Sequence, residues 1–179
     1  QLRTNVSHLY DFWLENWYPA QLEADLEPHG IIYAVDGIPG REPRAFYNSE
    51  SKTGILVNTD NYGPLRSLAL GLVMDVSERI FNVYSLRGMS ADWSGNGLIL
   101  IGPKGTRKTE LFYSLLKEDG MRLQANDLVF VRFSGNIAMT DCSERKLYLP
   151  TNTVDSYPRV SELFDNSKCE NVITLKDDC

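Results

Sequence analysis

The 179-residue sequence has no long hydrophobic run, because no apolar stretch approaches the roughly 18 residues that cross a bilayer. No secretory signal peptide is recognisable either. Cysteine is scarce: Cys142, Cys169 and Cys179 are far apart and show no CxxC spacing. The sequence therefore predicts no membrane segment, no zinc site and no disulfide framework. We expect a reduced protein of the cytoplasm.

Basic charge is also in short supply, since 18 Lys and Arg residues face 24 Asp and Glu residues and give a net charge of −6. Non-specific binding to nucleic acid requires a positive field, so we expect no nucleic-acid partner. Apolar residues make up 42% and charged residues 23%, as in globular proteins with a sizeable core. The length suits one domain. The sequence begins without methionine and ends in Lys-Asp-Asp-Cys, so we expect a fragment.

The most informative motif is the octapeptide Gly-Pro-Lys-Gly-Thr-Arg-Lys-Thr at residues 102–109. It follows the apolar run 98–101 and precedes a helical pattern at 110–116, which is the strand–loop–helix order of a phosphate-binding P-loop. Backbone N–H groups of such a loop and the helix dipole attract an anion. The candidate phosphate-binding residues are Gly102, Lys104, Gly105, Thr106, Arg107, Lys108 and Thr109.

Two side chains of this loop have specific expected roles. Lys108 would supply positive charge to the outer phosphates, and the Thr109 hydroxyl would bind Mg²⁺. Arg107 departs from the motif, which has glycine at that position. The alternative is a Gly-Pro turn followed by exposed cations. Cations at a helix start oppose the helix dipole, so this cluster favours an anionic ligand.

Asp127 is the candidate for the acidic half of the site. It ends the first expected strand after the P-loop helix, and ligands gather at the carboxyl ends of strands in open α/β sheets. A carboxylate there would hold Mg²⁺ together with Thr109. The alternative is that Asn126 and Asp127 form a tight turn between two strands, because both residue types favour turns.

Hydrophobic periodicity predicts three helices. An aromatic face predicts one at 8–17, Leu65 to Ile80 at helical spacing predict another at 64–80 with Pro64 first, and the third follows the P-loop and is capped near Gly120. The aromatic helix could dock a partner, but core packing is the more frequent role.

Short apolar stretches between turn residues predict strands. The first group should form an antiparallel meander at 31–35, 45–47 and 54–57. The later strands are expected at 82–84, 89–93, 98–101, 122–127, 128–133 and 137–140, and short helical turns at 150–164.

The stretch from Ser85 to Val131 resembles the bacterial HPr kinase/phosphorylase family, which shares a P-loop architecture with phosphoenolpyruvate carboxykinases. The resemblance lies in Ser-Leu-Arg-Gly at 85–88, Gly-Asn-Gly at 95–97, the P-loop with Lys-Thr-Glu at 108–110, and Ala-Asn-Asp at 125–127. It implies an α/β P-loop domain with a mixed sheet and an N-terminal helical and β-meander portion. Residues 1–179 would be one nucleotide-binding domain, in which 1–60 form the N-terminal portion and 61–179 the kinase-like core.

The same resemblance implies ATP and Mg²⁺ as cofactors, a serine or small-molecule hydroxyl as phosphate acceptor, and a homo-oligomer. The sequence departs from the family pattern at residues with a chemical role: Arg87 replaces the family's histidine, and Asn126 replaces the first aspartate of its pair. The candidate catalytic residues are Asn126, Asp127 and Arg87, and we expect impaired phosphotransfer because Asn126 cannot accept a proton. Alternatives are a non-catalytic module that senses a nucleotide or phosphometabolite and binds a partner protein, or a structural domain whose loop binds nothing.

Overall fold

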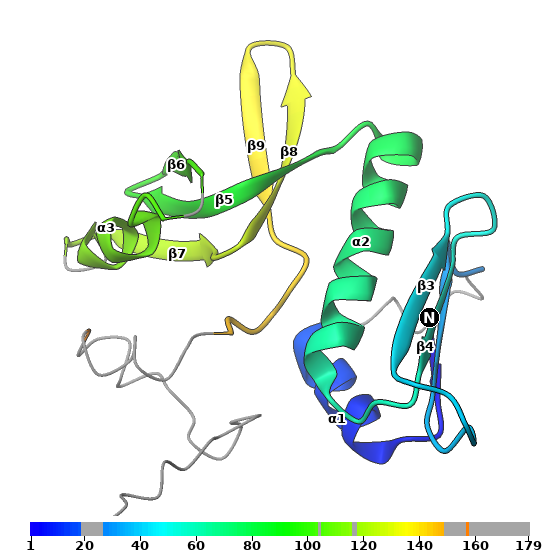
Figure 1. Cartoon of the computed structure of the whole chain (residues 1–179). Helices are drawn as coiled ribbons and strands as arrows, with labels where there is room; N and C mark the ends of the chain where they lie inside the picture. Colours follow the sequence, from blue (N-terminus) through cyan, green and yellow to red (C-terminus); the bar gives the residue numbers. More distant parts are fainter. Residues whose placement is uncertain (19–26, 104, 116–117, 149–156, 158–179) are drawn as a thin grey trace, which may run out of the picture. The chain divides into compact units, whose positions relative to one another are not determined.

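The computed structural model describes residues 1–18, 27–103, 105–115, 118–148 and 157. The chain divides into two units, Gln1–Tyr148 and Leu149–Cys179. All described residues except Tyr157 belong to the first unit. The expected helical turns at 150–164, apart from Tyr157, and also Cys169 and Cys179, lie outside the described residues. The described chain is mixed α/β, with two sheets and three helices (Figure 1).

The first sheet contains parallel strands, so the expected antiparallel meander is wrong. Its order is β1 (Leu2–Thr4), β2 (Ile31–Val35), β4 (Thr53–Val57) and β3 (Arg44–Asn48). The β1–β2 and β2–β4 pairs are parallel, and only β3 and β4 form an antiparallel hairpin. Apolar patterns report which face of a strand is buried but not its direction. Direction is set here by the connections, because α1 (Ser7–Asn16) lies between β1 and β2 in the chain.

Both N-terminal helices contribute to the core of this sheet. Buried side chains from α1, α2 (Tyr62–Phe81) and the sheet form one cluster: Leu9, Ile32, Ala34, Leu56, Tyr62, Leu65 and Ala69. The aromatic residues Phe12, Trp13 and Trp17 pack against it, which confirms the core interpretation of the first helix. From the sequence we expect the domain to divide between residues 60 and 61. In the structure β4 and α2 lie on either side of this division and pack in the same core.

The ends of α2 have recognisable caps. Asn61 is the N-cap, and its side chain accepts a hydrogen bond of 2.8 Å from the Gly63 N–H, so the helix begins two residues before Pro64. Asn82 ends the helix in the left-handed conformation, with φ of 53°. The expected strand at 82–84 is therefore wrong at Asn82, because this residue closes the helix.

The second sheet is built around β5 (Tyr84–Trp93). On one side β5 pairs with β6 (Asn96–Ile101), and on the other it pairs with β7 (Met121–Ala125) and then β8 (Leu128–Ser134). The hairpin partner of β8 is β9 (Ile137–Asp141). All of these pairs are antiparallel. Residues 84–87 pair with β8, so β5 is one long strand where two short ones were expected.

A charged cluster on α2 holds the edge of the first sheet. The Tyr47 hydroxyl donates a hydrogen bond of 2.6 Å to Asp75 Oδ2, and Arg79 Nε lies 2.6 Å from Asp75 Oδ1. Lys52 Nζ lies 3.2 Å from Asp75 Oδ2. The Tyr47 hydrogen bond, aided by the two cations, lowers the pKa of Asp75 below its ordinary 3.8.

We expect Asp75→Asn to reduce the acid sensitivity of the fold. Because the folded pKa of Asp75 is below the unfolded value, the ionised carboxylate stabilises the fold at pH values above the unfolded pKa. That contribution disappears as the pH falls through the folded pKa. Urea unfolding at about pH 7 and about pH 3 should therefore show a smaller loss of stability for the variant. An equal loss in both proteins would contradict the assignment.

Candidate phosphate-binding site

The expected loop and the expected acidic residue lie at the same level of the second sheet. Ile101, the last residue of β6, pairs with Gly88 on one side of β5. On the other side the Gly88 N–H donates a hydrogen bond of 3.1 Å to the Asp127 carbonyl. Two interstrand spacings of about 4.8 Å therefore separate the start of the loop from Asp127. Because β6 and β7 are both antiparallel to β5, they run in the same direction and end on the same side.

Close packing of backbone fixes this arrangement at Gly88. A Cβ atom at this position would lie 2.8 Å from the Leu100 carbonyl oxygen, which is closer than side chains tolerate. The strand that carries the loop can approach β5 here only because residue 88 is glycine.

The loop backbone adopts left-handed conformations at two residues. Gly105 has φ of 88°, and Arg107, which stands where the motif has glycine, has φ of 55°. Lys108 and Thr109 then open α3 (Lys108–Leu115), as the sequence predicts. Lys104 lies outside the described residues. The backbone at Arg107 therefore has a glycine-like conformation without the glycine.

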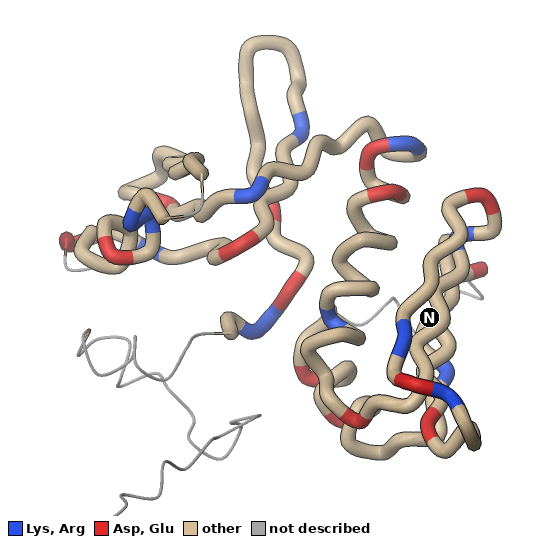
Figure 2. The backbone as a smooth tube through the Cα atoms, viewed as in Figure 1, with Lys and Arg blue, Asp and Glu red and all other residues tan. Residues whose placement is uncertain are grey.

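Two donors of the loop meet on one carbonyl group. Lys108 Nζ donates a hydrogen bond of 2.7 Å to the Pro103 oxygen, and the Thr106 hydroxyl donates one of 2.8 Å to the same atom. Arg107 Nη1 lies 3.9 Å from Glu110 Oε2, a long ion-pair distance, and both side chains are exposed. A phosphate oxygen at this position would replace the Pro103 carbonyl oxygen as the acceptor of these two hydrogen bonds. Figure 2 shows the basic residues at the start of α3.

Asp127 faces solvent beside a cation. Its Oδ1 lies 3.7 Å from Arg87 Nε, with the two side chains 50% and 81% exposed, so this contact contributes little to stability. Within the described ranges no group of three or more His, Cys, Asp or Glu residues is placed to hold a metal ion. A bound Mg²⁺ would therefore draw on Asp127, Thr109, water and the phosphates of its ligand.

Asn126 has structural partners. Its Oδ1 accepts a hydrogen bond of 3.0 Å from the hydroxyl of Tyr113 on α3, and its Nδ2 donates one of 3.4 Å to the Tyr148 carbonyl. Asn126 and Asp127 do not form a tight turn between paired strands, because β7 and β8 follow each other along the same side of β5. Asn126 and Asp127 separate the stretch of pairing between β5 and β7 from that between β5 and β8. The hydrogen bond from Tyr113 to the Asn126 side chain connects this point to the buried face of α3.

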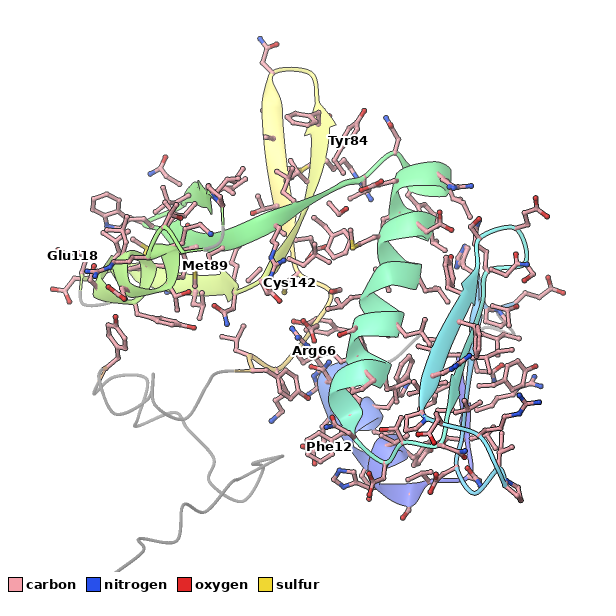
Figure 3. All side chains as sticks on the ribbon, viewed as in Figure 1. Phe12, Arg66, Tyr84, Met89, Glu118 and Cys142 are labelled. Atoms are coloured by element: carbon pink, nitrogen blue, oxygen red, sulfur yellow. The ribbon has the colours of Figure 1, made fainter. Side chains whose placement is uncertain are left out.

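Sequence reasoning missed a half-buried ion pair next to this break. Arg66 on α2 makes a bidentate contact with Glu144, with Nε–Oε1 and Nη2–Oε2 distances of 2.6 and 2.7 Å. Asn16 Nδ2 donates to Glu144 Oε1 at 2.8 Å and to the Tyr62 hydroxyl at 3.0 Å. The Arg66 guanidinium lies 5.0 Å from the centre of the Tyr148 ring. Figure 3 labels Arg66 on α2.

Burial and the Glu144 carboxylate together set the pKa values in this cluster. Burial raises the pKa of Tyr62 to about 12. Burial alone would lower the pKa of Arg66, but the hydrogen bonds and charge of Glu144 more than offset it and raise that pKa. Arg66 and Glu144 are 78 positions apart, and no local pattern marks them as partners. The cluster attaches the segment after β9, whose Tyr148 carbonyl meets Asn126, to α1 and α2.

No protein-family model matches this sequence, and no curated protein is significantly similar to it. The assignment of a function therefore rests on the geometry of the loop at 102–109 and of Asp127. None of the helices in the described part of the chain is long and apolar enough to span a bilayer.

We expect Arg107→Gly to stabilise the protein by about 1 kcal/mol, because a left-handed residue with a Cβ costs roughly that much. Glycine removes this cost, although it also increases the entropy of the unfolded chain. Arg107→Ala keeps the Cβ and loses only an exposed side chain, so it serves as the matched control. Urea unfolding should rank Gly above both Ala and wild type. Equal stability of the Gly and Ala variants would show that the backbone at residue 107 is unstrained.

Proposed function

We propose that the chain binds a nucleotide, ATP, through the triphosphate at residues 102–109, as an α/β P-loop domain of the HPr kinase and carboxykinase type that acts in the cytoplasm. One observation carries the proposal: the loop that leads into α3 and the Asp127 carboxylate flank Gly88 at the same level of β5. Phosphate positioning and metal binding require a cationic loop and a carboxylate at such a distance.

The roles of the side chains follow from their positions. Lys108 and Arg107 would contact phosphate oxygens, and Thr109 and Asp127 would hold Mg²⁺. Arg87 lies near enough to Asp127 to balance its charge or to contact a phosphate. If the site transfers a phosphoryl group, the γ-phosphate of ATP would pass to a serine or small-molecule hydroxyl.

Phosphotransfer is expected to be weak. Asn126 cannot take a proton from a hydroxyl, and its amide is already bonded to Tyr113 and Tyr148. Loss of a general base costs about two to four orders of magnitude in rate. These contacts favour a second candidate function, a non-catalytic module that senses a nucleotide or phosphometabolite and binds a partner protein.

Calorimetric titration with ATP, with and without Mg²⁺, tests the binding proposal. We expect affinity in the micromolar range that strengthens when Mg²⁺ is present. The absence of heat up to millimolar ATP would refute a nucleotide site. Transfer of labelled γ-phosphate to casein or to water, measured on the same sample, then separates an enzyme from a sensing module.

A further inference from the structure

In the part of the chain that the structure describes, the first sheet has one covered face and one open face. The covered face holds Ile32, Ala34 and Leu56 in the core with α1 and α2. It also holds Gly54, where a Cβ would lie 3.1 Å from Leu68 of α2. Figure 1 shows α2 along this face of the sheet. Side chains alternate along a strand, so the neighbouring positions point to the opposite face.

The strand register aligns apolar side chains on the open face. Tyr33 pairs with Ile55 and Ile55 with Phe46, which makes a row across three strands. Phe46 is 54% and Ile55 41% exposed. The flanking positions on this face add half-buried apolar residues: Ile31, Val35 and Val57.

A parallel arrangement makes this exposure unusual. All-parallel sheets occur almost only with both faces covered, and the solvated face that an antiparallel sheet often leaves in water is polar. Here β1, β2 and β4 are parallel, yet the open face is apolar and two of its large side chains are well exposed. Apolar patches of this kind mark interaction surfaces.

The charges at the rim of this row identify the kind of partner. The charged side chains at the paired positions of the open face are both arginines: Arg3 next to Tyr33, and Arg44 next to Val57. Arg3 stacks on the Tyr33 ring at 5.6 Å. Two cations on a chain of net charge −6 give this face a sign opposite to that of the whole protein. A second copy would bring the same two arginines to the contact, whereas a partner with carboxylates would be attracted.

We propose that the open face of the first sheet docks an acidic amphipathic α-helix of a partner protein. Four strands span three interstrand spacings, roughly 14 Å, which accommodates one helix of about 10 Å diameter. The apolar face of that helix covers Phe46, Ile55 and Tyr33. Its carboxylates reach Arg3 and Arg44 on the two edge strands, β1 and β3. The docked helix covers the apolar row that the described residues leave exposed.

Fluorescence anisotropy with two labelled peptides tests the proposal. Each probe is a helical peptide of about 18 residues with leucine at positions i, i+3, i+4 and i+7; one carries Glu and the other Lys on its polar face. We expect the Glu peptide to bind the full chain at least about tenfold more tightly than the Lys peptide. The double variant Arg3→Glu, Arg44→Glu should reverse this preference, and Phe46→Asp should abolish binding of the Glu peptide. Circular dichroism confirms that each variant is folded.

Three results would overturn the proposal. The first is equal or absent binding of the two peptides. The second is a dimer, detected by sedimentation velocity, that Phe46→Asp dissociates, because the occupant would then be a second copy. The third is Phe46-dependent binding to vesicles of phosphatidylserine and phosphatidylcholine, which would make the face a lipid-binding surface.

Discussion

Lys108→Ala is expected to weaken ATP binding by about 100-fold, because a charge-assisted hydrogen bond to a phosphate contributes about 1.5–3 kcal/mol. Among the described residues, Lys108 Nζ donates its hydrogen bond to the Pro103 carbonyl, at an exposed site. The free energy of unfolding should therefore change by no more than about 0.5 kcal/mol. Calorimetric titration with ATP and Mg²⁺ gives the affinity, and urea unfolding gives the stability.

The matched control is Arg41→Ala, which removes a cation from an exposed loop of the first sheet. Its ATP affinity should equal that of the wild type. If the Lys108 variant also binds like the wild type, the nucleotide does not occupy this loop. If both variants lose affinity to the same extent, the effect is one of overall charge, and it should then decrease as salt is added.

A second large effect is expected for Glu144→Ala, which should lower the free energy of unfolding by about 3 kcal/mol. Arg66 and Glu144 are only 19% and 12% exposed, so removal of the carboxylate leaves a largely buried guanidinium without its bidentate partner. Asn16, which is fully buried, loses the acceptor for one of its amide hydrogens as well. Urea unfolding monitored by tryptophan fluorescence measures the change.

The double variant Arg66→Met, Glu144→Leu is the informative control. Removal of both charges leaves no unpaired ion, so this variant should be more stable than Glu144→Ala alone. Arg79→Ala, which breaks an ion pair whose arginine is 61% exposed, should cost no more than about 1 kcal/mol. Equal losses for the single and double variants would mean that Glu144 acts through packing rather than charge.

Local signals in the sequence predicted the three helices and most strands, but not β1 or the continuity of β5. The helical spacing of Leu65, Leu68 and Leu72 predicted α2, and the short apolar stretch at 31–35 between turn residues predicted β2, because both patterns depend on burial at short range. The direction of β2 relative to β4 could not be predicted this way. Its parallel pairing depends on how residues 36–52 cross to β3 and return, which is a property of the whole sheet.

In the candidate site, too, local features could be predicted from the sequence and long-range contacts could not. The motif predicted that Lys108 and Thr109 open a helix, and the apolar pattern predicted a strand that ends at Asp127, whereas β7 ends two residues earlier, at Ala125. Both features are local. That Gly88 lies between the loop and Asp127 depends on pairing across β5 and is not visible in any single segment. The contacts of Asn126 with Tyr113 and of Arg66 with Glu144 are likewise made only after the chain has folded.

Each sheet combines one or more local hairpins with pairings between residues far apart in the chain, and this difference in separation sets an expected order of folding. β5 and β6 are joined by the two residues Ser94 and Gly95, whose φ angles of 51° and 86° suit a tight hairpin turn. In the first sheet Arg3 must find Tyr33, 30 residues away. Hairpins close in about 1–10 μs, whereas distant pairings first require the loss of loop entropy. The β5–β6 and β3–β4 hairpins should therefore form early, and the distant pairings of β1 with β2 and of β5 with β8 should be completed last.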